Sequence, residues 1–281
     1  KKIKTFSVGF ENSVDIINAR KVAEFLETDH YELILTEEEM LQAIEKDIEL
    51  IESYDTTTIR ASTPMYLLCK YIKENTDITV IFSGEGSDEA SGSYMYFHNA
   101  PSANDFNYET CRLLKDLCYF DVLRGDKSSS SNGLEIRVPF LDKEFIQYYM
   151  SISPDLKMPS TFDIEKYLLR KSFEESNIIP DEILWRKKEG MSDGVSKKNR
   201  GWFEIIQEYV CNKISDDEMN NASQTFPFNT PKTKESLYFR KIFNKFYPGR
   251  EDTIPYYWLP KWCGDISEPS ARVLNCYNDN K

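Results

Sequence analysis

Apolar residues in the first 35 positions form two short runs that flank one amphipathic stretch. Residues 3–10 and 31–35 are short and apolar, which predicts strands. Between them, residues 15–27 place apolar side chains three to four positions apart, the spacing of one helix face. A strand, a helix and a second strand at this distance predict a βαβ unit with parallel strands.

The next 50 residues continue this alternation. Thr36 and Glu39 match a capping box, and the apolar stripe after them predicts a helix with one buried face. Thr63 followed by Pro64 predicts the start of a second helix, over residues 64–73. Residues 78–82 are apolar, β-branched and uncharged, so we expect a strand that is buried on both faces of a parallel sheet.

Strand character is scarce from residue 104 onward. Apolar stripes at helical spacing instead predict helices over residues 109–120, 121–130, 142–150, 164–174, 202–214 and 235–246. We therefore predict an α/β fold, a parallel sheet with flanking helices followed by a mostly helical half. We expect residues 1–281 to be one domain, with an α/β part (1–100) and a helical part (101–281), and residues from 275 on to fray.

Composition excludes several functional classes. The 281 residues carry a net charge of −12, which argues against non-specific nucleic-acid binding. No apolar run approaches the roughly 18 residues of a membrane span. Six scattered cysteines without a C-x-x-C pair predict reduced thiols and a cytoplasmic protein, and with only two histidines a His-based zinc site is not expected.

The strand predicted at residues 78–82 runs into the sequence S-G-E-G-S-D-E at positions 83–89. Two glycines allow a tight turn and a close approach of the backbone to a ligand. Three carboxylates within five residues are costly unless a cation compensates them. Ligands of open α/β sheets bind beyond the carboxyl ends of strands, so this turn is a candidate site. Spacing alone leaves an ordinary solvated loop as an equal alternative.

The letters of this motif resemble the glutamine-dependent asparagine synthetases. Further stretches resemble the same family in the same order, at residues 53–64, 133–142, 185–189, 192–195 and 230–236. The stretches 257–262 and 269–272 resemble its eukaryotic branch. Together they cover nearly the whole chain, and five long motifs in order are far more specific than one.

The resemblance implies an adenine nucleotide alpha hydrolase-like fold and a two-step reaction. ATP, with Mg²⁺, would activate the side-chain carboxylate of aspartate as an acyl-adenylate, and ammonia would then displace AMP. Ammonia would come from a glutaminase domain of the same polypeptide. Neither that domain nor the family's first strand with its S-G-G-x-D-S pyrophosphate loop is found in this sequence. We therefore expect a fragment of a longer enzyme, with little activity alone; a homodimer is left open.

Three catalytic candidates follow from the resemblance. Glu85 would position the substrate amine or take the ammonia proton, and Lys188 would face the pyrophosphate. Arg60 would clamp a carboxylate or phosphate with paired hydrogen bonds. Composition alone would instead make Lys188 part of a solvated basic turn and Arg60 a member of a surface salt bridge.

Four further residues would bind the nucleotide and aspartate by the same resemblance, with the metal ligands unknown. Val8 would contact the adenine through its backbone, although a core valine fits equally well. Ser83 and Gly84 would surround AMP, and Asp88 would lie near the aspartate amine or the metal.

Other positions are read structurally or depart from the family pattern. Arg137 and Asp142 are expected to form a buried ion pair. Arg124-Gly125-Asp126-Lys127 stands where Arg-Ala-Asn-Lys is usual. Two alternatives stay open, a related adenylating enzyme such as a β-lactam-forming synthetase and a non-catalytic binding domain.

Overall fold

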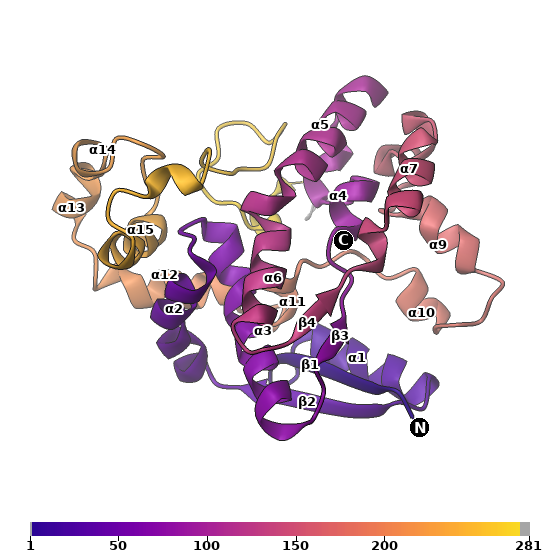
Figure 1. Ribbon diagram of the computed structural model, residues 1–281. Helices are drawn as coiled ribbons and strands as arrows, with labels where there is room; N and C mark the ends of the chain where they lie inside the picture. The colour runs from indigo at the N-terminus through magenta and orange to yellow at the C-terminus, as the bar shows by residue number, and fades with distance from the viewer. Residues whose placement is uncertain (1, 276–281) are drawn as a thin grey trace.

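The computed structural model describes residues 2–275, so the fraying expected from residue 275 falls mostly outside the described residues. The chain is α/β and contains two separate two-stranded parallel sheets. β1 (Lys4–Phe10) pairs with β2 (Asp29–Leu35), and β3 (Val80–Phe82) pairs with β4 (Glu135–Arg137). Figure 1 shows the strands close together at the lower centre, with helices on both sides.

The first βαβ unit forms as the sequence predicts. Helix α1 (Val14–Phe25) begins after Ser13, whose hydroxyl accepts the Ile16 backbone N–H. Ile16 and Ala23 are buried on its inner face. The two strands then pair in parallel from Lys4 opposite Asp29 onward. Local capping and one apolar stripe are enough to specify this unit.

Helices make up most of the remaining chain. The longer ones are α2 (Glu37–Ile51), α3 (Thr56–Asn75), α5 (Ala103–Asp116), α6 (Asp121–Ser130), α7 (Lys143–Ser151), α9 (Tyr167–Phe173), α12 (Trp202–Cys211) and α15 (Lys234–Phe246). The short ones are α4 (Ser87–Ser91), α8 (Pro159–Phe162), α10 (Asp181–Leu184), α11 (Met191–Gly194), α13 (Asp216–Asn220) and α14 (Ala222–Thr225). None of the described helices is both long and apolar enough to cross a membrane.

The largest hydrophobic core joins the first and last thirds of the chain. The apolar stripe of α2, which includes Ile44 and Ile48, packs with the inner faces of α12 and α15. Trp202 and Phe239 are completely buried there. Because residues 200 positions apart share this core, the helical half is an integral part of the fold rather than an appendage.

Helix α3 begins earlier than the sequence predicted. Its N-cap is Asp55, and Pro64 lies inside the helix rather than at its start. Proline removes one helical N–H, which leaves the carbonyl four residues before it without its helical donor. That carbonyl belongs to Arg60, and it accepts the indole N–H of Trp202 at 3.2 Å. A tertiary hydrogen bond therefore allows the helix to continue through Pro64.

The prediction of a fully buried strand at residues 78–82 was wrong. In β3, Val80 is 43% and Phe82 77% exposed. Strand β4 was missed because it is only three residues long and its outer two residues are exposed. The expected Arg137–Asp142 pair does not form, since exposed Arg137 pairs with Glu135 and Asp142 caps α7.

Candidate functional site

A cleft of about 590 Å³ lies beside β1 and α1 and reaches the turn after β3. Five of the seven residues expected at the site line it: Val8, Gly84, Glu85, Asp88 and Lys188. They come from β1, from the 83–89 turn and from the segment before α11. The structure thus brings together residues up to 180 positions apart along one cavity.

The 83–89 turn brings three acids to the cleft, Glu85, Asp88 and Glu89. Gly86 has φ +84°, a left-handed conformation, and a Cβ atom there would lie 2.3 Å from the side chain of Leu141. Glycine is therefore required at this position. A Cβ atom on Gly84 would meet nothing within 4 Å, so the backbone at Gly84 is open on its cleft side.

Asp88 lies between two lysines from the helical half. Lys166 Nζ is 2.7 Å from Asp88 Oδ1, and Lys188 Nζ is 2.9 Å from Oδ2. Burial alone would raise the pKa of Asp88, but the two ammonium groups outweigh it and hold the pKa well below its usual range. Burial opposes the charge of Lys188, yet Asp88 keeps the Lys188 pKa raised. Two lysines therefore share one carboxylate, and the cleft wall around them also carries Asp15, Glu85, Glu89 and Glu189.

Glu85 pairs with Arg124 of α6. The Nη2 atom of Arg124 lies 2.9 Å from Glu85 Oε2, and Arg124 also bonds to Asp121. Burial raises the pKa of Glu85, with Arg124 opposing the shift. A carboxylate whose pKa is moved toward neutrality can accept or return a proton during a reaction.

Glu89 is the third acid of the turn that lines the cleft, and it is only 2% exposed. Its carboxyl accepts the hydroxyl of Tyr94. Burial, with the nearby charges of Asp121 and Asp88, raises its pKa well above the usual range. Its protonated form is therefore favoured, which reduces the repulsion among the acids of the turn.

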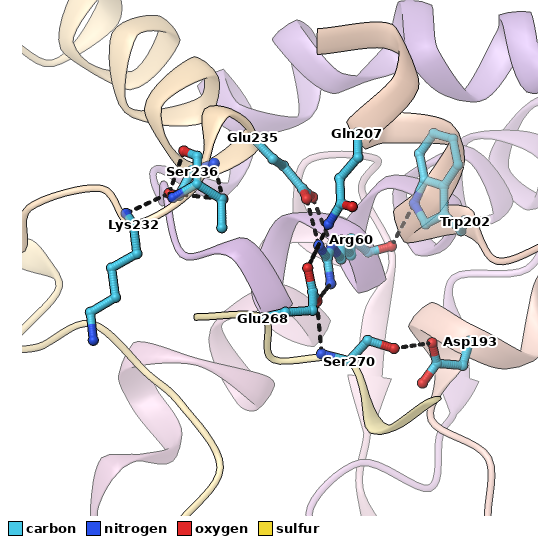
Figure 2. Close-up of polar contacts among 10 residues, drawn as sticks. Arg60, Asp193, Trp202, Gln207, Lys232, Glu235, Ser236, Glu268 and Ser270 are labelled. Carbon is cyan, nitrogen blue, oxygen red and sulfur yellow. Dashed lines mark hydrogen bonds and ion pairs between the residues drawn. The ribbon is translucent and has the colours of Figure 1, made fainter. Parts of the chain in front are cut away.

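Arg60 lies outside the main cleft and is buried at 2% exposure. Its guanidinium donates to both oxygens of Glu235 and both oxygens of Glu268, at 2.5–3.0 Å (Figure 2). The surface salt bridge considered as an alternative is therefore excluded. Arg60 also lines a small adjoining cavity of about 70 Å³ together with Lys188 and Asp193. Direct contact of Arg60 with a substrate stays a prediction.

The remaining two candidates differ in their surroundings. Val8 is 5% exposed and belongs both to the main core and to the cleft wall. Ser83 is not among the residues that line the cleft, and its backbone N–H donates to the Arg137 carbonyl at 2.9 Å. Its place at the end of β3 therefore extends the strand pairing into the turn.

Sequence reasoning did not assign Lys166 and Arg124 to the site. Arg124 belongs to the stretch compared with the family's Arg-Ala-Asn-Lys pattern, which could have pointed to it. No local signal marks Lys166, which lies just before α9 with φ 58°. Only the packing of the helical half against the 83–89 turn brings its ammonium group to Asp88.

The acids of the cleft do not form a metal site by themselves. Across residues 2–275, no group of three or more His, Cys, Asp or Glu side chains is arranged to hold a metal ion. Lysines engage both oxygens of Asp88. A divalent ion at this site would therefore need ligands from a bound substrate.

The chain is an α/β protein with parallel strands. Its charged cleft lies at the carboxyl end of β3, where α/β proteins bind their ligands. A family model described as asparagine synthase matches residues 1–108 and 101–266. The chain belongs to the asparagine synthase family.

Relatives extend this likeness along the chain. This chain is 52% identical over 275 residues to the human protein named asparagine synthetase (glutamine-hydrolyzing). It is 51% identical to the mouse protein and 50% identical to the chicken protein of that name. Each alignment covers 98% of this chain but 49% of the relative. The chain thus spans about half the length of the curated relatives it matches.

Proposed function

We propose that this chain is the synthetase part of an enzyme that converts aspartate to asparagine with ATP. A β-aspartyl-AMP intermediate forms first, with release of pyrophosphate, and ammonia derived from glutamine then releases AMP. The observation that carries the proposal is the convergence of Glu85, Asp88 and Lys188 on one cleft in a chain of this family. A non-catalytic binding role would not require these paired charges.

The charges suggest a division of labour within the cleft. Lys188 and Lys166 both pair with Asp88, and we assign Lys188, which lines the cleft, to the departing pyrophosphate. Glu85 is paired with Arg124, and we assign it to the substrate amine or to the ammonia proton. Val8, Ser83 and Gly84 are assigned to the nucleotide, and Arg60 to a carboxylate or phosphate.

We propose that the finer fold is that of the adenine nucleotide alpha hydrolases, completed by an upstream strand and its pyrophosphate loop. Among the described strands, β1 pairs only with β2 and β3 only with β4. The outer edges of β1 and β3 are therefore open to a further strand. Exposed Phe82 gives that strand an apolar contact.

Mg²⁺ is proposed to bind together with the phosphates of ATP, because Glu85 and Asp88 of the cleft are already paired with cations. The ammonia is proposed to come from a glutaminase domain of the same polypeptide. A cytoplasmic location agrees with scattered, unpaired cysteines such as Cys69 and Cys111.

Pyrophosphate exchange tests the substrate assignment. We expect the full-length polypeptide to exchange labelled pyrophosphate into ATP only when aspartate is present. Equal exchange with and without aspartate would reject aspartate as the substrate and favour another carboxylate. The described chain alone is expected to show little or no synthesis, because the proposed upstream loop holds the pyrophosphate.

Substitution of Glu85 tests the site. Glu85→Gln keeps the shape of the side chain but removes its base, so asparagine formation should fall by roughly 100- to 10,000-fold. Glu144→Gln, at an exposed position on α7, is the matched control and should leave turnover unchanged. Normal turnover of a folded Glu85→Gln protein would remove Glu85 from the chemistry.

A further inference from the structure

A short segment near the C-terminal end of the described chain links core helices to the segment that carries Lys188. We define the C-terminal strap as residues 268–272. Its first residue, Glu268, accepts hydrogen bonds from Arg60 and from Gln207, whose Nε2 atom lies 2.5 Å away (Figure 2). The backbone N–H of Ser270 donates to Glu268 at 2.9 Å. One end of the strap is thus fixed to helices α3 and α12.

The other end of the strap holds the segment that carries Lys188. We define the site loop as residues 188–197. Ser270 Oγ donates to Asp193 Oδ1 at 3.0 Å (Figure 2). Arg272 donates to the backbone carbonyls of Asp193 and Lys197 at 2.8 and 2.9 Å. Side chains of the strap therefore fix the loop through its side chains and its backbone.

The site loop connects these contacts to the cleft. Lys188 at its start reaches Asp88. Further along, the carbonyl of Val195 accepts the backbone N–H of Phe10 at the end of β1, at 2.9 Å. Gly194 packs so closely on Asp15 in the cleft wall that a Cβ atom would lie 2.2 Å from its carboxylate. Movement of this loop would therefore displace groups on the cleft wall.

The contacts between the strap and the site loop are buried, which makes these hydrogen bonds stronger than exposed ones. Asp193 is 3% exposed, and the Arg272 side chain 8%. Burial raises the pKa of Asp193 and the Arg272 guanidinium opposes the rise. Hydrogen bonds to charged groups in such surroundings are stronger than those at the surface, and removing one partner leaves the other unpaired. The strap thus constrains the loop in one arrangement.

We propose that Glu268, Ser270 and Arg272 are positioning residues that hold Lys188 against Asp88. The strap itself touches neither Asp88 nor the 83–89 turn through any described hydrogen bond or ion pair, so it acts through the loop. The role of Lys188 toward pyrophosphate rests on the proposed function, whereas its placement by the strap does not.

Competitive acetylation of lysines, read by mass spectrometry, tests the placement without any activity. Lys188 paired with Asp88 stays protonated and reacts slowly, so its labelling reports the pair. Arg272→Ala should raise the labelling of Lys188 about tenfold, as expected for loss of a charge-assisted hydrogen bond. Lys166 pairs with the same carboxylate but lies outside the loop, so its labelling should show no rise. Arg250→Ala, at an exposed arginine, is the control.

Two outcomes would overturn the proposal. Unchanged Lys188 labelling in folded Arg272→Ala protein would show that the strap does not position the lysine. A parallel rise at Lys166 would show general loosening instead. If Arg272→Ala does not fold, Ser270→Ala decides the question by the labelling of Lys188 relative to Lys166. It removes the hydroxyl that donates to Asp193 and accepts the Arg272 backbone N–H, and it leaves the Arg272 side chain in place.

An activity measurement separates this inference from the proposed function. In the full-length polypeptide, Arg272→Ala should raise the apparent KM for pyrophosphate in aspartate-dependent exchange more than it lowers the maximal rate. Absence of exchange in the unmodified protein would reject the proposed function. The labelling of Lys188 relative to Lys166 would still decide the role of the strap.

Discussion

Two glycines near the site should respond in opposite ways to substitution by alanine, which adds a single Cβ atom. Gly86 occupies a left-handed conformation against Leu141. Gly125 lies inside α6, where a Cβ atom would meet Glu85 and Ile136 at an ordinary contact distance of 3.4 Å. Helix interiors disfavour glycine because it loses more backbone freedom on folding. The family resemblance places alanine at this second position.

We predict that Gly125→Ala stabilises the protein by about 0.5–1 kcal/mol, the difference in helix propensity. Gly86→Ala should destabilise it by about 1–3 kcal/mol, because of the unfavourable φ and the overlap with Leu141. Urea unfolding of both variants measures the two effects. A Gly125→Ala protein less stable than the parent would show that the contact with Glu85 is strained.

Residue-scale reasoning from sequence succeeded where the determinants are local. The 83–89 motif indicated the tight turn and its three acids, because a glycine that adopts a left-handed φ marks a turn in the local sequence. It could not indicate Lys166, whose only connection to Asp88 runs through space.

At the scale of elements, helices α2 and α3 enclose a carboxyl group without a cation. Asp47 is fully buried, and its Oδ2 atom accepts the hydroxyls of Ser62 at 2.5 Å and Thr63 at 3.0 Å. No partner for its Oδ1 atom is found among the described residues. Burial raises the pKa of Asp47 from 3.8 to about 7, against the opposing effect of the two hydroxyls.

This buried acid predicts a pH dependence of stability. Between pH 3.8 and about 7 the unfolded chain loses the Asp47 proton while the folded chain keeps it. The contribution of Asp47 to the free energy of unfolding therefore falls as pH rises through this window, by on the order of 4 kcal/mol. Asp47→Asn should remove that loss. The free energy of unfolding of Asp47→Asn should therefore increase relative to that of the parent between pH 4 and pH 8.

Chemical denaturation at several pH values checks this expectation. Asp252→Asn, at an exposed aspartate, is the matched control and should follow the parent curve. Parallel curves for Asp47→Asn and the parent would contradict the expected titration of Asp47.

At the scale of the whole molecule, one buried ion cluster joins three distant parts of the chain. Arg60 of α3 meets Glu235 of α15 and Glu268 of the C-terminal strap (Figure 2). The side chain of Glu235 is completely buried and that of Arg60 is 3% exposed. Removing one member of such a cluster leaves an uncompensated charge in the core.

We predict that Arg60→Met destabilises the protein by about 3–5 kcal/mol, the cost of breaking a buried ion pair. Adding Glu235→Gln should recover part of this loss, because the second change removes one stranded charge. The exposed pair Lys245–Glu45, which likewise joins distant parts of the chain, is the control and should show a coupling of about 0–1 kcal/mol. Additive effects of the Arg60 and Glu235 substitutions in unfolding measurements would contradict this coupling.

The sequence by itself determined the features that depend on near neighbours. It specified the first βαβ unit, the capping box at Thr36 and the 83–89 turn, since caps, apolar stripes and the left-handed φ of Gly86 depend on a few neighbouring residues. The contact between Gly86 and Leu141 came only from the tertiary structure. Only the tertiary structure decided that α3 runs through Pro64, that Arg60 faces Glu235 and Glu268, and that Lys166 joins Lys188 at Asp88. Those outcomes depend on charges and hydrogen bonds between segments 78 to 208 residues apart, which no local pattern encodes.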